Sequence, residues 1–254
     1  MRRDGRRRRL PALSFALAAI LASMAGPAPA ADAPAERPIV LQAAHLFDGV
    51  SGKLAGPGMI VIRGQKIERV GGAVPAEARV IDLGDATLLP GLIDAHVHMD
   101  SEASGQWYRD FYDGIMRFPA ERALRGAGYA RATLRAGFTT VRDVGSDDYI
   151  ALGLRNAIAD GVIEGPRMLV SNYAIGSTAG HADQAPYPPE LIAPAGPVKG
   201  VCNGPEECRA AVRYQIKFGA DLIKFMPSGG VLSLTDPVDV PELTQAEANR
   251  VGTR

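Results

Sequence analysis

The chain has 254 residues, and its 28 basic and 28 acidic side chains cancel to a formal net charge of zero. This balance argues against a nucleic-acid-binding protein and gives no reason to expect an acidic partner. Hydrophobic residues make up 46% of the chain, which is enough for a packed globular core.

Residues 1–30 are typical of a signal peptide. An arginine-rich head precedes an apolar run from Leu10 to Ala25, and Ala28-Pro29-Ala30 then offers a site for signal peptidase. A single membrane anchor is the alternative, but a span needs about 20 apolar residues. The paired arginines also fit a twin-arginine signal. We therefore expect an exported protein, periplasmic or secreted, without a stable membrane anchor.

Residues 31–88 contain short apolar stretches with no helical pattern between them. Turn residues such as Asp48-Gly49 separate these stretches, and several of them alternate apolar and polar side chains. Closely spaced strands without helices predict the N-terminal part of a small β-sandwich. We expect its strands at residues 38–42, 59–62, 66–70, 80–83 and 87–89.

From residue 89 to residue 254, apolar strands alternate with helical segments, which predicts an α/β fold with a parallel sheet. The sheet is either an open doubly wound sheet or a barrel, and a (β/α)₈ barrel takes about 250 residues. Four strands make half of such a barrel, so we expect a truncated barrel. We expect strands at 91–98, 138–142, 167–170 and 221–225, and helices at 120–136, 150–160, 205–218 and from 243 onward.

The chain has two cysteines, Cys202 and Cys208. An exported protein meets an oxidising compartment, so a disulfide between them is one interpretation. Because Cys208 lies in a predicted helix and Cys202 just before it, two ordinary thiols are the other. A structural zinc site is not indicated, because there is no paired Cys-x-x-Cys.

Asp94, His96 and His98 alternate along one predicted strand, so their side chains share one face. Two imidazoles about 6.5 to 7 Å apart along a strand can bind one ion, each nitrogen about 2.0 to 2.1 Å away. Barrel active sites lie at the C-terminal strand ends, where His98 stands. We therefore predict His96 and His98 as metal ligands, with Asp94 orienting a ring nitrogen or closing the pocket floor. Two partly exposed histidines are the alternative.

The stretch Leu89-Pro-Gly-Leu-Ile-Asp-Ala-His-Val-His98 resembles the metal-binding signature of the amidohydrolase superfamily. The resemblance is strongest to the branch of imidazolonepropionase-like enzymes and Xaa-Pro or Xaa-Arg dipeptidases. It implies a β-sandwich followed by a distorted (β/α)₈ barrel. Three further stretches of this chain carry the resemblance, at residues 136–143, 178–183 and 219–231.

The resemblance implies that Lys224 is carboxylated and bridges two divalent metal ions, most simply Zn²⁺. A lysine facing two cations on a buried strand is driven toward its neutral amine, which can take up carbon dioxide. An exposed lysine that reaches solvent is the alternative. The remaining ligands of the family are two histidines and an aspartate from later strands, and these positions lie beyond this sequence.

The resemblance also places His181 in a loop near the substrate, where it is a candidate substrate-binding residue. The family pattern Gly-Gly-His-Gly-Asp is Ala179-Gly-His-Ala-Asp183 in this chain, which leaves a solvated loop histidine as the alternative.

The function implied by the resemblance is hydrolysis of C–N bonds in amides, dipeptides or cyclic amides by a hydroxide activated at two metal ions. Its substrates would be small molecules or short peptides. Because the chain carries part of the site, we expect it to be inactive unless a homo-oligomer or a complementing C-terminal half completes it. The alternatives are an ester hydrolase of the lactonase or phosphotriesterase type and a non-catalytic truncated remnant.

Overall fold

The computed structural model describes residues 37–183, 188, 190, 193–231, 233 and 236–252, without the side chains of Trp107 and Phe111. The predicted signal peptide, residues 1–30, lies outside the described residues. Within the described part of the chain, no helix combines the length and the apolar character that a membrane crossing needs. The chain divides into two compact units, one ending at Leu88 and one beginning at Leu89.

The first unit consists of two small sheets. One has the strand order β5-β4-β1-β6 and the other β3-β2-β7. Val40, Met59 and Val61 form the buried cluster of this unit. The strands β2 and β3 were not predicted, because the turn signal at Asp48-Gly49 dominates their stretch of sequence. The strands are β1 (Ile39–Ala43), β2 (His45–Phe47), β3 (Leu54–Ala55), β4 (Gly58–Arg63), β5 (Lys66–Val70), β6 (Arg79–Asp82) and β7 (Thr87–Leu88).

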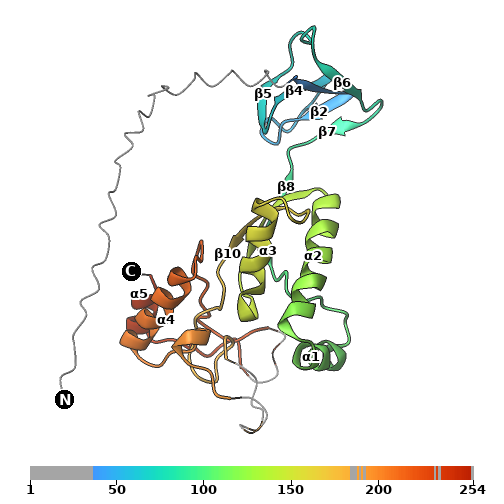
Figure 1. Cartoon of the computed structure of the whole chain (residues 1–254). Helices are drawn as coiled ribbons and strands as arrows, with labels where there is room; N and C mark the ends of the chain where they lie inside the picture. The colour runs from blue at the N-terminus through green and yellow to red at the C-terminus, as the bar shows by residue number, and fades with distance from the viewer. Residues whose placement is uncertain are drawn as a thin grey trace, which may run out of the picture. The chain divides into compact units, whose positions relative to one another are not determined.

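The second unit is built on a parallel three-stranded sheet of order β10-β9-β8, which confirms the predicted α/β fold. Helices α2 and α3 pack against each other and against the sheet (Figure 1). The strands are β8 (Leu92–Val97), β9 (Phe138–Asp143) and β10 (Arg167–Val170), and the helices are α1 (Trp107–Met116), α2 (Pro119–Arg135), α3 (Ile150–Ala159), α4 (Pro205–Lys217) and α5 (Gln245–Val251).

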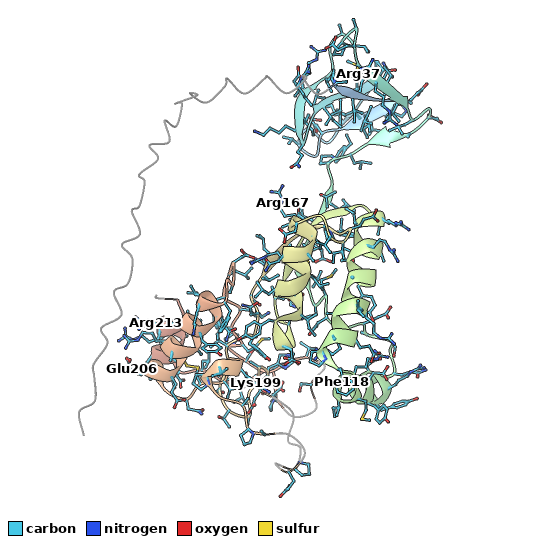
Figure 2. All side chains as sticks on the ribbon, viewed as in Figure 1. Arg37, Phe118, Arg167, Lys199, Glu206 and Arg213 are labelled. Atoms are coloured by element: carbon cyan, nitrogen blue, oxygen red, sulfur yellow. A yellow bond between two sulfur atoms is a disulfide. The ribbon has the colours of Figure 1, made fainter. Side chains whose placement is uncertain are left out.

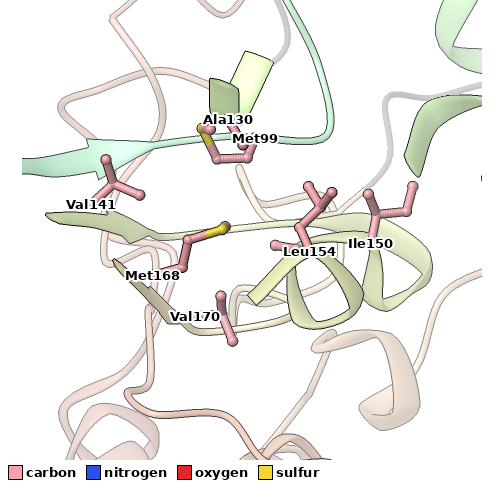
Figure 3. Packing of buried hydrophobic residues seen from close by; sticks show 8 residues of the cluster. Met99, Ala130, Val141, Ile150, Leu154, Met168 and Val170 are labelled. Atoms are coloured by element: carbon pink, nitrogen blue, oxygen red, sulfur yellow. The ribbon is translucent and has the colours of Figure 1, made fainter. Parts of the chain in front are cut away.

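The core of the second unit fills the space between this sheet and its two helices (Figure 3). Val141 and Met168 contribute from the strands, and Leu154 contributes from α3. Full burial of one such side chain is worth about 1.5 to 3 kcal/mol. Gly126 allows α2 to approach, because a Cβ at this position would lie 2.7 Å from the Met99 carbonyl oxygen. The core therefore fixes the backbone that follows β8.

The predicted fourth strand at 221–225 is wrong. Asp221 meets the end of β10 through a hydrogen bond from its N–H to the Val170 carbonyl. The chain after β10 then turns at Asn172, whose φ of 59° is left-handed, so the ladder is interrupted. Pairing resumes only as an isolated parallel bridge between Ile175 and Phe225.

Helix α4 buries one face against α5 and exposes the other. Figure 2 shows Glu206 and Arg213 on the exposed face. The buried face includes Cys208, whose sulfur is bonded to that of Cys202. Of the two interpretations left open by the sequence, the structure has the disulfide. This bond ties the loop before α4 to the helix.

Candidate metal centre

His96 and His98 lie together at the C-terminal end of β8. Their ring centroids are 5.4 Å apart, and the rings meet edge to face. Both side chains are exposed in the described chain, so both rings are open to a ligand. The alternation predicted from the sequence thus brings the two imidazoles to one place.

The ring of His98 is held by the loop after β9. Its Nδ1 lies 2.8 Å from the carbonyl oxygen of Gly145. Since a carbonyl only accepts, Nδ1 must carry the proton, and Nε2 of the neutral ring keeps its lone pair. Metal-binding histidines typically donate their second ring nitrogen to such a carbonyl. The geometry therefore fits a divalent metal ion at Nε2.

Asp94 supports the backbone of the pair. Its carboxylate accepts a hydrogen bond of 3.0 Å from the backbone N–H of His96. The two roles predicted for Asp94, orienting a ring nitrogen or closing the pocket floor, stay predictions beside this bond to the main chain. This bond restrains the backbone of β8 at His96.

The electrostatic surroundings of His96 connect it with Lys224. Desolvation lowers the pKa of His96, and the positive charges of Lys224, His98 and Arg142 lower it further. Lys224 is partly buried, and its carbonyl accepts from the N–H of Ile175 at 2.8 Å. The positive charge of Lys224 thus acts on His96.

Arg142 is a neighbour of the pair that the sequence analysis did not single out. It lies on β9, and its Nε donates to the carbonyl of Ala95 at 2.7 Å. The bond joins two strands across 47 positions of sequence. The sequence signal that could have indicated Arg142 is the alternation of β9, because it places Arg142 on the face of the strand opposite to that of the buried Val141.

Asp143 ends β9 and is fully buried. Its carboxylate accepts from the backbone N–H groups of Met99 at 2.7 Å and Gly145 at 3.2 Å. Burial raises the pKa of Asp143 to about 6, although the two hydrogen bonds act in the opposite direction. Because each of its two oxygens faces a backbone N–H, the side chain of Asp143 is an acceptor in both contacts.

His181 lies in the loop after β10 and is held on several sides. Its Nδ1 is 2.9 Å from the carboxylate of Asp236, and its backbone N–H donates to Glu242 at 2.8 Å. A Cβ on Gly230 would lie 2.1 Å from the ring, so only glycine fits there. The side chain remains 38% exposed, so the ring is oriented but still accessible.

Desolvation by burial acts to raise the pKa of Asp236. Hydrogen bonds from the Gly230 N–H, Ser233 and His181 outweigh it and hold this pKa below its ordinary value. Asp236 is therefore a charged acceptor, which makes Nδ1 of His181 the donor.

Among the described residues, no three His, Cys, Asp or Glu side chains gather in a way that could hold a metal ion. Within this part of the chain, His96 and His98 therefore form a pair without a third side chain of these four types beside them. Lys224 and Arg142 are the Lys and Arg side chains whose positive charges lower the pKa of His96.

The chain resembles known proteins over most of its length. The sequence profile of the amidohydrolase family matches residues 87–252. Ochratoxinase from Aspergillus niger is 33% identical over 178 residues, which are 63% of this chain and 35% of that protein.

Solved structures give the same picture. A Xaa-Pro dipeptidase with bound methionine in its active site has a TM-score of 0.76 at 36% identity, covering 85% of this chain and 53% of that one. A prolidase complexed with N-methylphosphonate-L-proline has a TM-score of 0.68 at 32% identity, covering 84% and 52%. The chain thus spans about half the length of these solved relatives.

Proposed function

Because the chain belongs to the amidohydrolase family, we propose that the protein hydrolyses C–N bonds at a centre of two divalent metal ions held by His96, His98 and Lys224. The observation that carries the proposal is the ring of His98. Its Nδ1–H is taken by the Gly145 carbonyl, so Nε2 is left as a metal ligand beside His96. Imidazole nitrogens are preferred ligands of Zn²⁺, which makes zinc the metal proposed.

The parallel strands β8, β9 and β10 are proposed to begin a (β/α)₈ barrel, with the first unit as its β-sandwich. Two features support this proposal. Helices α2 and α3 follow β8 and β9 in the order of a β/α barrel, and the histidine pair lies at the C-terminal end of β8, where barrel active sites lie.

Lys224 is proposed to be carboxylated. Its Nζ amine forms an N–C bond with carbon dioxide and releases a proton, which leaves an anion with two oxygen donors. The positive charge of Lys224 lowers the pKa of His96. Carboxylation reverses the sign of that charge, so it converts an unfavourable neighbour of a cation site into a ligand.

When bound, the metal ions supply Lewis-acid chemistry, lowering the pKa of water and polarising the scissile carbonyl. The residues of this chain hold the geometry for that chemistry. Asp94 restrains the backbone of His96, and the Gly145 carbonyl fixes the tautomer of His98. His181, oriented by Asp236, presents Nε2 as a hydrogen-bonding contact for substrate.

The proposed substrates are dipeptides and similar small amides. The solved relatives named above are a Xaa-Pro dipeptidase and a prolidase with a proline phosphonate, at 36% and 32% identity. No nucleic acid is proposed as a partner, since the chain has no net charge.

The test of the metal centre is zinc binding by the purified full-length protein, measured by competition with a chromophoric chelator. His96→Ala and His98→Ala should each lose most of the bound zinc and the hydrolysis of Xaa-Pro dipeptides. His45→Ala is the matched control, because His45 lies on β2 in the other unit. Equal zinc binding by all three variants would contradict the proposal, and hydrolysis of lactones but not dipeptides would correct the substrate class.

The role of Lys224 is tested by the same measurements. Lys224→Ala should lose zinc and activity, and short carboxylic acids added to the solution should restore part of both by standing in for the carbamate. Lys199→Ala is the control, since Lys199 is an exposed lysine of the same unit. Normal zinc content in Lys224→Ala would show that the lysine is not a ligand.

A further inference from the structure

The buried carboxylate of Asp143 joins two loops at the C-terminal edge of the sheet. One of its oxygens accepts from the N–H of Met99 at 2.7 Å, and the other accepts from the N–H of Gly145 at 3.2 Å. Met99 follows β8 and Gly145 follows β9, so the carboxylate bridges the ends of neighbouring strands. Asp143 itself has no solvent exposure.

Both of these backbone contacts bear directly on His98. Met99 is the next residue in the chain, so its N–H belongs to the peptide that carries the His98 carbonyl. Gly145 supplies the carbonyl that holds His98 Nδ1 at 2.8 Å. A Cβ on Gly145 would lie 3.2 Å from His98 Cε1, so the ring rests closely against this loop.

We infer that Asp143 is the positioning residue for the metal ligand His98, fixing both the backbone beside it and the carbonyl that sets its ring. The inference rests on the proposed metal centre. It assigns Asp143 no contact with substrate or metal. The residue acts through the peptide of Met99 and the loop of Gly145.

A carboxylate suits this task better than other side chains of its size. It accepts hydrogen bonds at both oxygens, and charge-assisted bonds to backbone N–H groups are about twice as strong as neutral ones. Asparagine offers one acceptor and one donor, so it satisfies only one of the two N–H groups. The backbone of Asp143 is also bonded to the neighbouring strand end, because the N–H of Ser171, which follows β10, donates to the Asp143 carbonyl at 3.0 Å.

The experiment compares Asp143→Asn with the wild-type protein in two measurements. The first is zinc affinity, which we expect to fall about 10- to 100-fold, as for other groups that orient a metal ligand. The second is the tautomer of His98 in the zinc-free protein, read from long-range ¹H–¹⁵N correlations of its imidazole. We expect the Nδ1–H form in the wild type and a mixture with the Nε2–H form in the variant.

Glu247→Gln is the matched control. Glu247 is another buried carboxylate that accepts two backbone N–H groups, from Gly204 and Thr244, but it lies in the α4–α5 cluster. It should lose stability without change in zinc affinity or in the His98 tautomer. A general loss of stability would change the zinc affinity and the His98 tautomer in both variants alike. A positioning role of Asp143 changes them only in Asp143→Asn.

Unchanged affinity and tautomer in a folded Asp143→Asn would overturn the inference and leave the proposed function standing. Wild-type protein that binds no zinc would overturn the proposed function. The His98 tautomer would still test whether Asp143 positions the ring through Met99 and Gly145. Asp143→Ser, smaller and still an acceptor, is the second variant if the first does not fold. If neither folds, Asp143 serves the fold as a whole and the assignment fails.

Discussion

His98 and His181 differ in the group that holds their rings. His98 donates Nδ1–H to a backbone carbonyl, which selects the tautomer whose Nε2 carries the lone pair when the ring is neutral. His181 has its Nδ1 at a buried carboxylate, that of Asp236. In both rings Nδ1 is engaged, so the proposed function uses Nε2 of His98 for a metal ion and Nε2 of His181 for a hydrogen bond with substrate.

The pairing of His181 with Asp236 predicts a defect in substrate binding when it is broken. In Asp236→Asn, the ring of His181 loses a charge-assisted hydrogen bond worth about 1.5 to 3 kcal/mol and is held less firmly in its orientation. We expect KM for dipeptides to rise about tenfold or more, with a smaller change in kcat and unchanged zinc content.

Asp239→Asn is the control for this prediction, because Asp239 is an exposed carboxylate of the same segment. Steady-state kinetics and metal analysis of both variants decide the outcome. A fall in zinc content, or a loss confined to kcat, would contradict the assignment of His181 as a substrate contact.

The residues of the site differ in how far sequence could predict them. The histidine pair follows from the alternation of a single strand, which is a local property. Asp143 and Arg142 act through contacts across 44 to 47 positions, from Met99 and to Ala95. The alternation of β9 predicts the face on which Arg142 lies, but the partners of Arg142 and Asp143 depend on which strands become neighbours, and the periodicity of one segment does not predict that.

At the level of elements, the same distinction separates correct from wrong predictions. Strands β8, β9 and β10 and helices α2, α3 and α4 have strong local patterns and lie close to their predicted bounds. The segment 221–225 has an equally apolar pattern, but its neighbour turns away at Asn172 and leaves one isolated bridge. A strand needs a partner of matching direction, and its own sequence does not supply that.

Helix α5 begins with a capping box that also binds a second helix. Thr244 and Glu247 satisfy each other's backbone N–H groups, and Glu247 accepts from the N–H of Gly204 at 2.6 Å. Backbone hydrogen bonds from Thr244 and Gly204 lower the pKa of Glu247. The carboxylate of Glu247 therefore links the start of α5 to the start of α4 by hydrogen bonds.

The hydrogen bonds of the Glu247 carboxylate predict how the stability of the protein depends on pH. Because the folded pKa of Glu247 lies below its ordinary value of 4.5, its contribution to the free energy of unfolding is present above pH 4.5 and is lost as pH falls through the folded value. Glu247→Gln should lower the free energy of unfolding by about 1 to 3 kcal/mol at pH 7, and the difference from wild type should shrink below pH 4. Denaturant unfolding at pH 7 and below pH 4 measures the difference in the free energy of unfolding between the variant and the wild type. A difference that does not change with pH would contradict the role of an ionised Glu247.

At the scale of the whole molecule, the disulfide bears on where the protein resides. Cys202 and Cys208 are both fully buried and bonded to each other. Structural disulfides form and persist in oxidising compartments and are rare in the cytosol of most organisms. This supports the proposal, first made from residues 1–30, that the protein is exported to the periplasm or secreted.

Export predicts a matched pair of outcomes, one at the N-terminus and one at the cysteines. The exported protein should begin at Ala31, because Ala28-Pro29-Ala30 is the proposed cleavage site. It should also resist thiol alkylation at Cys202 and Cys208 until it is reduced.

A version in which Met1 alone replaces residues 1–30 should remain in the cytoplasm with both thiols free. Closing so short a loop stabilises a fold by about 2 kcal/mol, so this version should unfold at lower denaturant concentration until it is oxidised. Intact-mass spectrometry with and without alkylation, together with denaturant unfolding, measures both outcomes. Retention of residues 1–30 in the membrane fraction would favour the anchor alternative, and free thiols in correctly cleaved protein would contradict the link between the disulfide and export.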